Sequence, residues 1–201
     1  TASRNMVKAA RGRIKVVCGA WKKVFPENKV DLRKAILMGG AGIRITDDPF
    51  VYVDKNFVRM AGGIGNAVVR AATLPDRTVA VQLKGEYDAI ADEAIEAVAA
   101  GAGIVMVDTG KVEDIKKVFK ALAEKGYRDA VKIGFGGAVT VSELEAVINA
   151  GADVVDVGRA IIDAPIIDFR FDVIKNAHPH LRESGVDRVV DGSTHESCSP
   201  A

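Results

Sequence analysis

Two glycine-marked corners follow apolar runs in the stretch between residues 132 and 161. The first is Gly134-Phe135-Gly136-Gly137, and the second is Gly158-Arg159-Ala160. Glycine lets backbone amides approach a ligand without an intervening Cβ, and an arginine donates two parallel hydrogen bonds to phosphate oxygens. One such corner is usually only a short turn. Two in succession favour a phosphate site, which we expect to comprise Gly136, Gly137, Gly158 and Arg159.

Charged residues follow two other apolar runs. Asp108 ends the run Gly103-Ile104-Val105-Met106-Val107, where an aspartate is either the N-cap of a helix starting near Gly110 or a ligand of Mg²⁺ or a ribose hydroxyl. Both interpretations stay open. Lys22 and Lys23 follow an early apolar run and precede Pro26, where a lysine pair is ordinarily solvated surface.

The second half of the chain alternates apolar runs with segments of helical periodicity. The runs span 78–83, 103–108, 130–135 and 153–158, with helical patterns such as 86–100 and a capping-box pattern at Thr140 and Glu143 between them. Strands joined by crossover helices lie parallel, and in parallel α/β layers the chemistry gathers at the carboxyl ends of the strands. All the candidate residues above follow predicted strands.

The first 77 residues are less regular. We expect a helix to about Arg11, a strand over 13–18, a short helix over 31–37, a strand over 50–54 and a helix over 61–72. The predicted fold class is α/β, a parallel (β/α) barrel of TIM type that is incomplete or irregular in its first third. The predicted domains are the barrel at 1–173 and a polar tail at 174–201.

Composition excludes several classes of protein. Net charge is +1 with interspersed signs, so we expect no nucleic acid and no membrane as partner. The only cysteines, Cys18 and Cys198, form no disulfide framework, and a reducing cytoplasm is the expected location. The tail residues His178, His180, His195 and Cys198 fit no zinc spacing.

Taken together, the order of motifs across residues 1–173 resembles the catalytic barrel of the quinolinate phosphoribosyltransferase family. The family's Thr-Arg-Lys-Thr motif is matched by Trp21-Lys22-Lys23-Val24 before Pro26, and its glycine turn ending in His-Arg is matched by residues 38–44. Its Leu-Ile-Lys-Asp-Asn-His strand is matched by residues 52–57. The segments 102–109, 134–140 and 151–173 match in close register.

The resemblance implies an enzyme, a pentosyltransferase that joins quinolinate to phosphoribosyl pyrophosphate with Mg²⁺ in NAD biosynthesis and releases pyrophosphate and carbon dioxide. It implies catalytic roles for Lys23 and Asp108, with Asp108 serving the metal or the ribose. Lys22, Arg44 and Gln82 would bind substrate, and the glycine corners would hold the 5′-phosphate. It also implies a homo-oligomer.

The chain departs from the family pattern at several charged positions. Ile43 and Phe57 replace histidines, and Asp54 replaces a lysine. In the strand where the family places glutamates, the chain has Ala80, Gln82 and Lys84. We therefore expect poor binding of the dianion quinolinate, because an unpartnered buried carboxylate is costly. The alternatives are another phosphate-binding barrel enzyme (a sugar-phosphate lyase, isomerase or synthase) and a non-catalytic phosphate-binding regulatory or assembly subunit.

Overall fold

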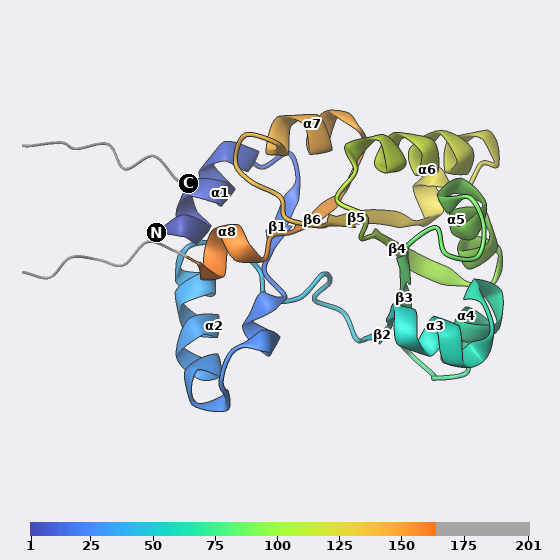
Figure 1. Ribbon diagram of the computed structural model, residues 1–201, viewed down its shortest axis with the longest axis horizontal. Coiled ribbons are helices and arrows are strands. Elements are labelled where there is room, and N and C mark those ends of the chain that lie inside the picture. Colours follow the sequence, from blue (N-terminus) through green and yellow to red (C-terminus); the bar gives the residue numbers. More distant parts are fainter. Residues whose placement is uncertain (164–201) are drawn as a thin grey trace, which may run out of the picture. The chain divides into compact units, whose positions relative to one another are not determined.

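Six parallel strands form the framework of the chain in the computed structural model, which describes residues 1–163 (Figure 1). The sheet order is β1-β6-β5-β4-β3-β2, so each strand from β2 onward lies beside its successor and the last lies beside the first. The strands are β1 (Lys15–Val17), β2 (Phe50–Val53), β3 (Thr78–Leu83), β4 (Ala102–Val107), β5 (Lys132–Gly136) and β6 (Val154–Asp156).

This order is that of a (β/α) barrel, and the predicted parallel α/β class is confirmed. Val17 and Gly42 form an isolated parallel bridge beside β1. Within residues 1–163 no strand ladder joins β1 to β2, so the sheet is open between these two edges. The irregularity therefore falls in the first third of the chain, as predicted.

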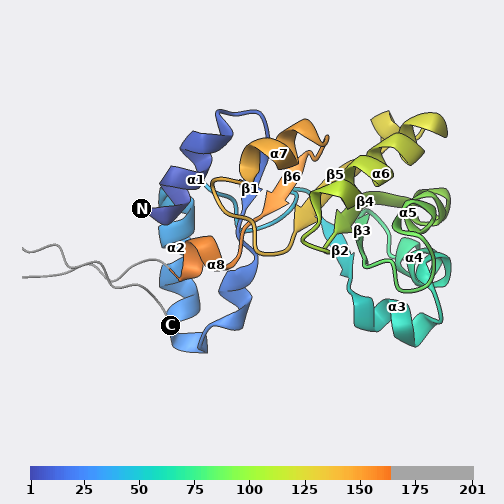
Figure 2. The same cartoon turned by 45° about the horizontal axis from the view of Figure 1, so that its top comes forward.

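Helices connect the strands and pack around the outside of the sheet (Figures 1 and 2). The residues of β3–β6 that point toward them, such as Val81, Val105 and Ile133, join one large buried cluster with the helices. The helices are α1 (Ala2–Ala10), α2 (Lys29–Met38), α3 (Lys55–Ala61), α4 (Ile64–Ala72), α5 (Ile90–Ala99), α6 (Val112–Glu124), α7 (Leu144–Asn149) and α8 (Arg159–Ile162), with 3₁₀ turns η1 (Ala20–Lys23), η2 (Pro26–Asn28) and η3 (Arg128–Ala130).

The opposite face of the sheet carries a second, smaller apolar cluster. Its buried members are Val17, Ile45, Ala80, Ile104, Met106 and Val154, with Phe50 packed against them. Side chains alternate between the two faces of a strand, so the inner face continues two residues further along each strand. The residues that follow on this face of β3, β4 and β6 are polar: Gln82, Asp108 and Asp156.

Several element boundaries differ from the sequence expectation. The helix predicted over 61–72 begins at Ile64 as α4, and α3 precedes it without having been predicted; Gly62 and Gly63, with φ values of 77° and 145°, separate the two. The helix predicted from Glu86 begins at Ile90, since the preceding amides bond to Glu93. The helix predicted from Thr140 begins at Leu144, although Glu143 Oε2 does accept a 2.9 Å hydrogen bond from Thr140 N.

None of the helices within the described part of the chain is long and apolar enough to cross a membrane. The predicted domain boundary at residue 173, the polar tail and its histidines lie outside the described residues.

Candidate functional site

Polar residues extend the inner face of the sheet at its carboxyl end. On each of three strands, a polar residue lies two positions after a buried apolar residue and on the same face: Gln82 after Ala80, Asp108 after Met106, and Asp156 after Val154. Glycines make room for these side chains: a Cβ on Gly136 would lie 3.2 Å from Asp108 Oδ1, and one on Gly19 would lie 2.9 Å from Asp156 Oδ2. Gly134 in the same way makes room for Met106. Gly134 and Gly136 in the first glycine corner are therefore explained, at least in part, by the space that neighbouring side chains of the sheet need.

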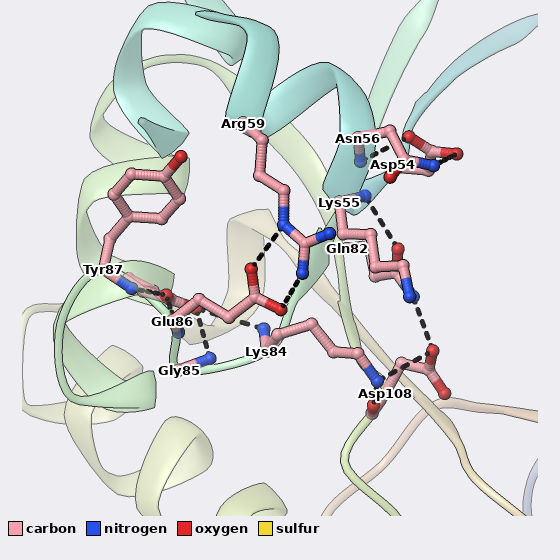
Figure 3. Close-up of polar contacts among 11 residues, drawn as sticks. Asp54, Lys55, Asn56, Arg59, Gln82, Lys84, Gly85, Glu86, Tyr87 and Asp108 are labelled. Atoms are coloured by element: carbon pink, nitrogen blue, oxygen red, sulfur yellow. Dashed lines mark hydrogen bonds and ion pairs between the residues drawn. The ribbon is translucent and has the colours of Figure 1, made fainter. Parts of the chain in front are cut away.

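Gln82, Asp108 and Lys84 form one hydrogen-bonded unit (Figure 3). Gln82 Oε1 accepts from the backbone N–H of Lys55 at 2.8 Å, and Gln82 Nε2 donates to Asp108 Oδ2 at 2.5 Å. Lys84 Nζ donates to the carbonyl oxygen of Asp108 and lies 3.4 Å from Asp108 Oδ2. The three side chains thus fix one another at the ends of β3 and β4.

Asp108 is not a helix cap. Helix α6 begins at Val112, its N-cap residue is Lys111, and that cap makes no side-chain hydrogen bond. Of the two sequence interpretations of Asp108, the N-cap is wrong.

Asp156 lies at the end of β6, where its Oδ1 accepts a 2.7 Å hydrogen bond from Gly19 N. Burial raises the pKa of Asp156, the bond from Gly19 and the charges of Lys22 and Lys23 oppose that rise, and the charge of Asp108 adds to it. The lysine pair occupies η1, directly after β1, with both side chains exposed. The structure therefore brings Lys22 and Lys23 to the same end of the sheet as Asp108 and Asp156.

Tyr52 is a candidate that the sequence analysis did not select. It lies on β2 two residues after Phe50, on the inner face. Burial raises the pKa of its hydroxyl, and the carboxylates of Asp108, Asp156 and Asp54 raise it further. The alternation of side chains along Phe50-Val51-Tyr52-Val53 indicates that Phe50 and Tyr52 share one face of the strand. Deciding that this is the inner face requires the register of the strand in the sheet.

The loop between β3 and α5 is held by a buried carboxylate. Glu93, on α5, is 1% exposed. Its Oε2 accepts from the backbone N–H groups of Lys84 and Gly85 at 3.2 and 2.8 Å, and its Oε1 accepts from those of Glu86 and Tyr87 at 2.8 and 3.0 Å. This clamp fixes the backbone from which the Lys84 side chain extends.

The same loop is tied to α3 (Figure 3). Arg59 donates to both carboxylate oxygens of Glu86, at 2.9 and 2.7 Å. Asp54, which stands before α3, is that helix's N-cap and accepts from the backbone N–H groups of Asn56 and Phe57 at 2.8 and 3.0 Å.

The two glycine corners lie at the ends of β5 and β6, which are neighbours in the sheet. Gly137 has φ 118°, and a Cβ on it would lie 2.5 Å from both the N and Cα atoms of Gly110. Gly110 N donates to Gly136 O at 3.2 Å. The loops after β4 and β5 thus touch backbone to backbone.

Arg159 is the first residue of α8, after Gly158. Its side chain is 84% exposed, and its Nε donates to Asp163 Oδ2 at 3.1 Å. The structure thus places Gly158 and Arg159 at the predicted strand end, with the guanidinium paired to a carboxylate four residues later.

Arg44 lies away from the other predicted site residues. Its guanidinium carbon is 5.2 Å from the centroid of the Phe50 ring, and Phe50 opens β2 at the amino end of the sheet. A cavity of about 710 Å³ lies at that amino end, and its lining includes Thr46, Thr78 and Lys132. The structure does not bring Arg44 together with Lys23 or Asp108.

Within residues 1–163 no group of three or more His, Cys, Asp or Glu side chains converges to hold a metal ion. Asp108 and Asp156 are close enough at this end for the charge of Asp108 to raise the pKa of Asp156. Asp108 Oδ1 accepts no hydrogen bond from the described residues, and neither does Asp156 Oδ2. Two carboxylates suit a cation that is also bound by substrate phosphates.

Comparisons with known proteins agree with this fold. Residues 1–172 match the family model described as quinolinate phosphoribosyl transferase, C-terminal domain. The human nicotinate-nucleotide pyrophosphorylase [carboxylating] is 30% identical over 172 residues, which are 84% of this chain and 56% of the human protein. A probable enzyme of the same name from Methanothermobacter thermautotrophicus is 26% identical over 175 residues, 86% of this chain and 62% of that protein.

Solved structures give the same relationship. The nicotinate-nucleotide pyrophosphorylase of Francisella tularensis superposes with a TM-score of 0.63 at 26% identity, covering 80% of this chain and 54% of that one. The Pyrococcus furiosus protein of that name has the same fold, with a TM-score of 0.69 at 20% identity over 82% of this chain and 46% of the other.

This chain spans less than two thirds of the length of the curated relatives named above. The family model nevertheless covers most of the chain. With its parallel strands in barrel order, the chain belongs to the quinolinate phosphoribosyl transferase family, matching its C-terminal domain.

Proposed function

We propose that this chain is the barrel of a phosphoribosyltransferase that binds phosphoribosyl pyrophosphate with Mg²⁺ and joins the phosphoribosyl group to a nitrogen base, releasing pyrophosphate. The activity for which the relatives are named, nicotinate-nucleotide pyrophosphorylase, is the parent reaction. The observation that carries the proposal is the meeting of lysines and carboxylates at the carboxyl end of the sheet: Lys22, Lys23 and Lys84 with Asp108 and Asp156.

The chemistry that such a site performs is charge stabilisation. As pyrophosphate leaves, positive charge develops on the ribose ring and negative charge on the leaving group. Asp108 and Asp156 would stabilise the sugar side, and Lys23 with Lys22 would neutralise the pyrophosphate. Because Lys22 and Lys23 already act electrostatically on Asp156, both signs of charge are in place before substrate binds.

The neighbouring ends of β5 and β6 are the proposed seat of the 5′-phosphate. Gly136, Gly137 and Gly158 would present backbone there, and Arg159 would add its guanidinium. The ion pair between Arg159 and Asp163 is exposed, so releasing it for a phosphate costs little.

Mg²⁺ fits as an ion shared between substrate and protein. It is usually bound by one or two carboxylates together with substrate phosphates, and Asp108 and Asp156 supply the carboxylates. When bound, the ion would neutralise the pyrophosphate as it leaves. Arg44, predicted to bind substrate, lies at the other end of the sheet and has no part in this proposal.

Calorimetric titration of the purified protein with phosphoribosyl pyrophosphate and Mg²⁺ tests the proposal. We expect saturable binding, and a loss of about tenfold or more in affinity for Lys23→Met, because a charged hydrogen bond to phosphate is removed. Quinolinate should bind weakly, since Ile43, Asp54 and Phe57 offer its carboxylates no cation. A wild-type protein that neither binds phosphoribosyl pyrophosphate nor releases pyrophosphate would favour the non-catalytic alternative.

A further inference from the structure

Lys84 lies within this site, although the sequence motifs gave it no role. It is one residue past β3, its side chain is 29% exposed, and its ammonium contacts Asp108 through both the carbonyl and the carboxylate. The rest of the unit is fixed around it: Gln82 bonds to Asp108 and to the backbone of Lys55 (Figure 3). Its position is thus determined by three neighbouring elements.

The backbone of Lys84 is fixed independently of its side chain. Buried Glu93 accepts the Lys84 N–H at 3.2 Å and those of the next three residues, and the pair between Arg59 and Glu86 ties the same loop to α3. A change at the Lys84 side chain therefore leaves the loop's own hydrogen bonds intact. The ammonium is presented from a rigid base, which is what a substrate-binding cation requires.

Lys84 and Asp108, the two charged residues of the hydrogen-bonded unit, can each form further hydrogen bonds. An ammonium has three N–H donors, and Lys84 directs two of them toward Asp108, one to the carbonyl and one to a carboxylate oxygen at 3.4 Å. Asp108 uses Oδ2 for Gln82 and Lys84, while its Oδ1 has no partner within the described residues. The Asp108 side chain as a whole is 34% exposed.

One cationic donor and one carboxylate acceptor therefore lie side by side. The two neighbouring parts of a phosphoribosyl pyrophosphate molecule with matching needs are an anionic pyrophosphate oxygen and a ribose hydroxyl. At the end of the adjacent strand β2, Asp54 carries the opposite charge, and its carboxylate accepts the backbone N–H groups that cap α3.

We propose that Lys84 is a substrate-contacting residue, whose ammonium binds a pyrophosphate oxygen of the phosphoribosyl donor while Asp108, held beside it by Gln82, accepts from a ribose hydroxyl. The inference rests on the proposed function and adds to it a cation from β3. It assigns Gln82 to positioning Asp108, because both ends of its amide are already bonded within the protein.

The test is calorimetric binding of phosphoribosyl pyrophosphate with Mg²⁺ to the wild type, Lys84→Met, Lys84→Arg and the control Lys120→Met. Lys120 is also an ion-paired lysine, 78% exposed, toward the far end of α6. We expect Lys84→Met to lose about tenfold or more in affinity, Lys84→Arg to lose less, and Lys120→Met to bind as the wild type does. Circular dichroism on each variant confirms that it is folded.

Two results separate the failure of this inference from failure of the proposed function. If the wild type binds the donor and Lys84→Met binds it equally well, Lys84 does not contact substrate, even if pyrophosphate release slows, and the inference is overturned alone. If the wild type shows no binding, the proposed function fails and the inference fails with it. Should Lys84→Met fold poorly, Lys84→Gln takes its place, because it removes the charge and keeps a polar side chain. Loss of affinity in a folded Lys84→Gln protein supports contact, and unchanged affinity overturns the inference.

Discussion

At the scale of single residues, the site is defined by charges in partly buried positions. Asp156 shows this most clearly, because burial raises its pKa although Gly19 N–H and two lysines favour its ionised form. The folded-state pKa therefore lies above the unfolded value of about 3.9. An aspartate with this sign of shift costs stability once it ionises, so Asp156 does not serve to stabilise the fold at neutral pH.

Asp156→Asn should stabilise the protein at neutral pH. Well below about pH 3.9 the aspartate is protonated in both states and contributes no such cost; the cost grows as the pH rises from the unfolded pKa to the higher folded pKa and is constant above it. The variant keeps an oxygen that can accept from Gly19 N. Urea unfolding from pH 4 to 8 should show a difference in the free energy of unfolding between variant and wild type that widens as the pH rises from 4 and levels off above the folded pKa. A difference that is constant or narrows over this range would contradict the assigned direction.

At the scale of elements, one helix residue determines the conformation of a whole loop. Glu93 stands in the first turn of α5, yet its carboxylate turns toward the end of β3 and accepts four backbone N–H groups. Carboxylates that accept several amides make strong, charge-assisted bonds. This interaction also explains why α5 begins at Ile90, later than its apolar periodicity indicates.

Glu93→Gln should destabilise the protein by about 2–3 kcal/mol, because the amide offers one acceptor oxygen and directs N–H donors at the N–H groups of the loop. Urea unfolding measures the loss, and hydrogen exchange should show faster exchange at residues 84–87. Asp92→Asn is the matched control, since Asp92 is the neighbouring acidic residue of the same turn and is exposed. Equal losses from the two substitutions would refute the clamp.

At the scale of the whole described chain, the carboxyl and amino ends of the sheet carry different groups of side chains. The carboxyl end gathers the lysines and carboxylates of the proposed site. The amino end contains a cavity of about 710 Å³ and Arg128, which donates to Val131 O, Gly151 O and Asp153 Oδ1 at 3.0, 3.3 and 2.7 Å. In parallel α/β barrels the amino end generally serves stability.

Arg128→Met should therefore lower stability by about 2 kcal/mol and leave the affinity for phosphoribosyl pyrophosphate unchanged. Thermal or urea unfolding gives the first quantity and calorimetry the second. Arg13→Met is the control for an arginine in a more exposed ion pair, with Glu145, and should cost about 1 kcal/mol or less. A large affinity loss in Arg128→Met would show that the two ends are coupled.

The sequence predicted the strands from residue 78 onward because each is a short apolar run followed by a helical pattern. It missed α3, whose residues have no continuous apolar stripe, although Asp54 is an N-cap. It placed Asp108, Lys22 and Lys23 at strand ends. It did not single out Tyr52, Asp156 or Lys84, because the strand register decides which alternate residues of a strand face inward. It could not place Arg44, because residues 39–49 show no helical or strand periodicity.

The direct backbone contact between Gly110 and Gly137 restricts how this lineage can change its ligand. A Cβ at position 137 would lie 2.5 Å from the backbone of Gly110, so any larger residue there would have to push the loops after β4 and β5 apart. We therefore expect changes of ligand specificity to come more readily from the segments following β1, β2 and β3 than from Gly137. The positions at which this chain departs from the family pattern include Ile43, Asp54 and Lys84, and all three lie in those segments.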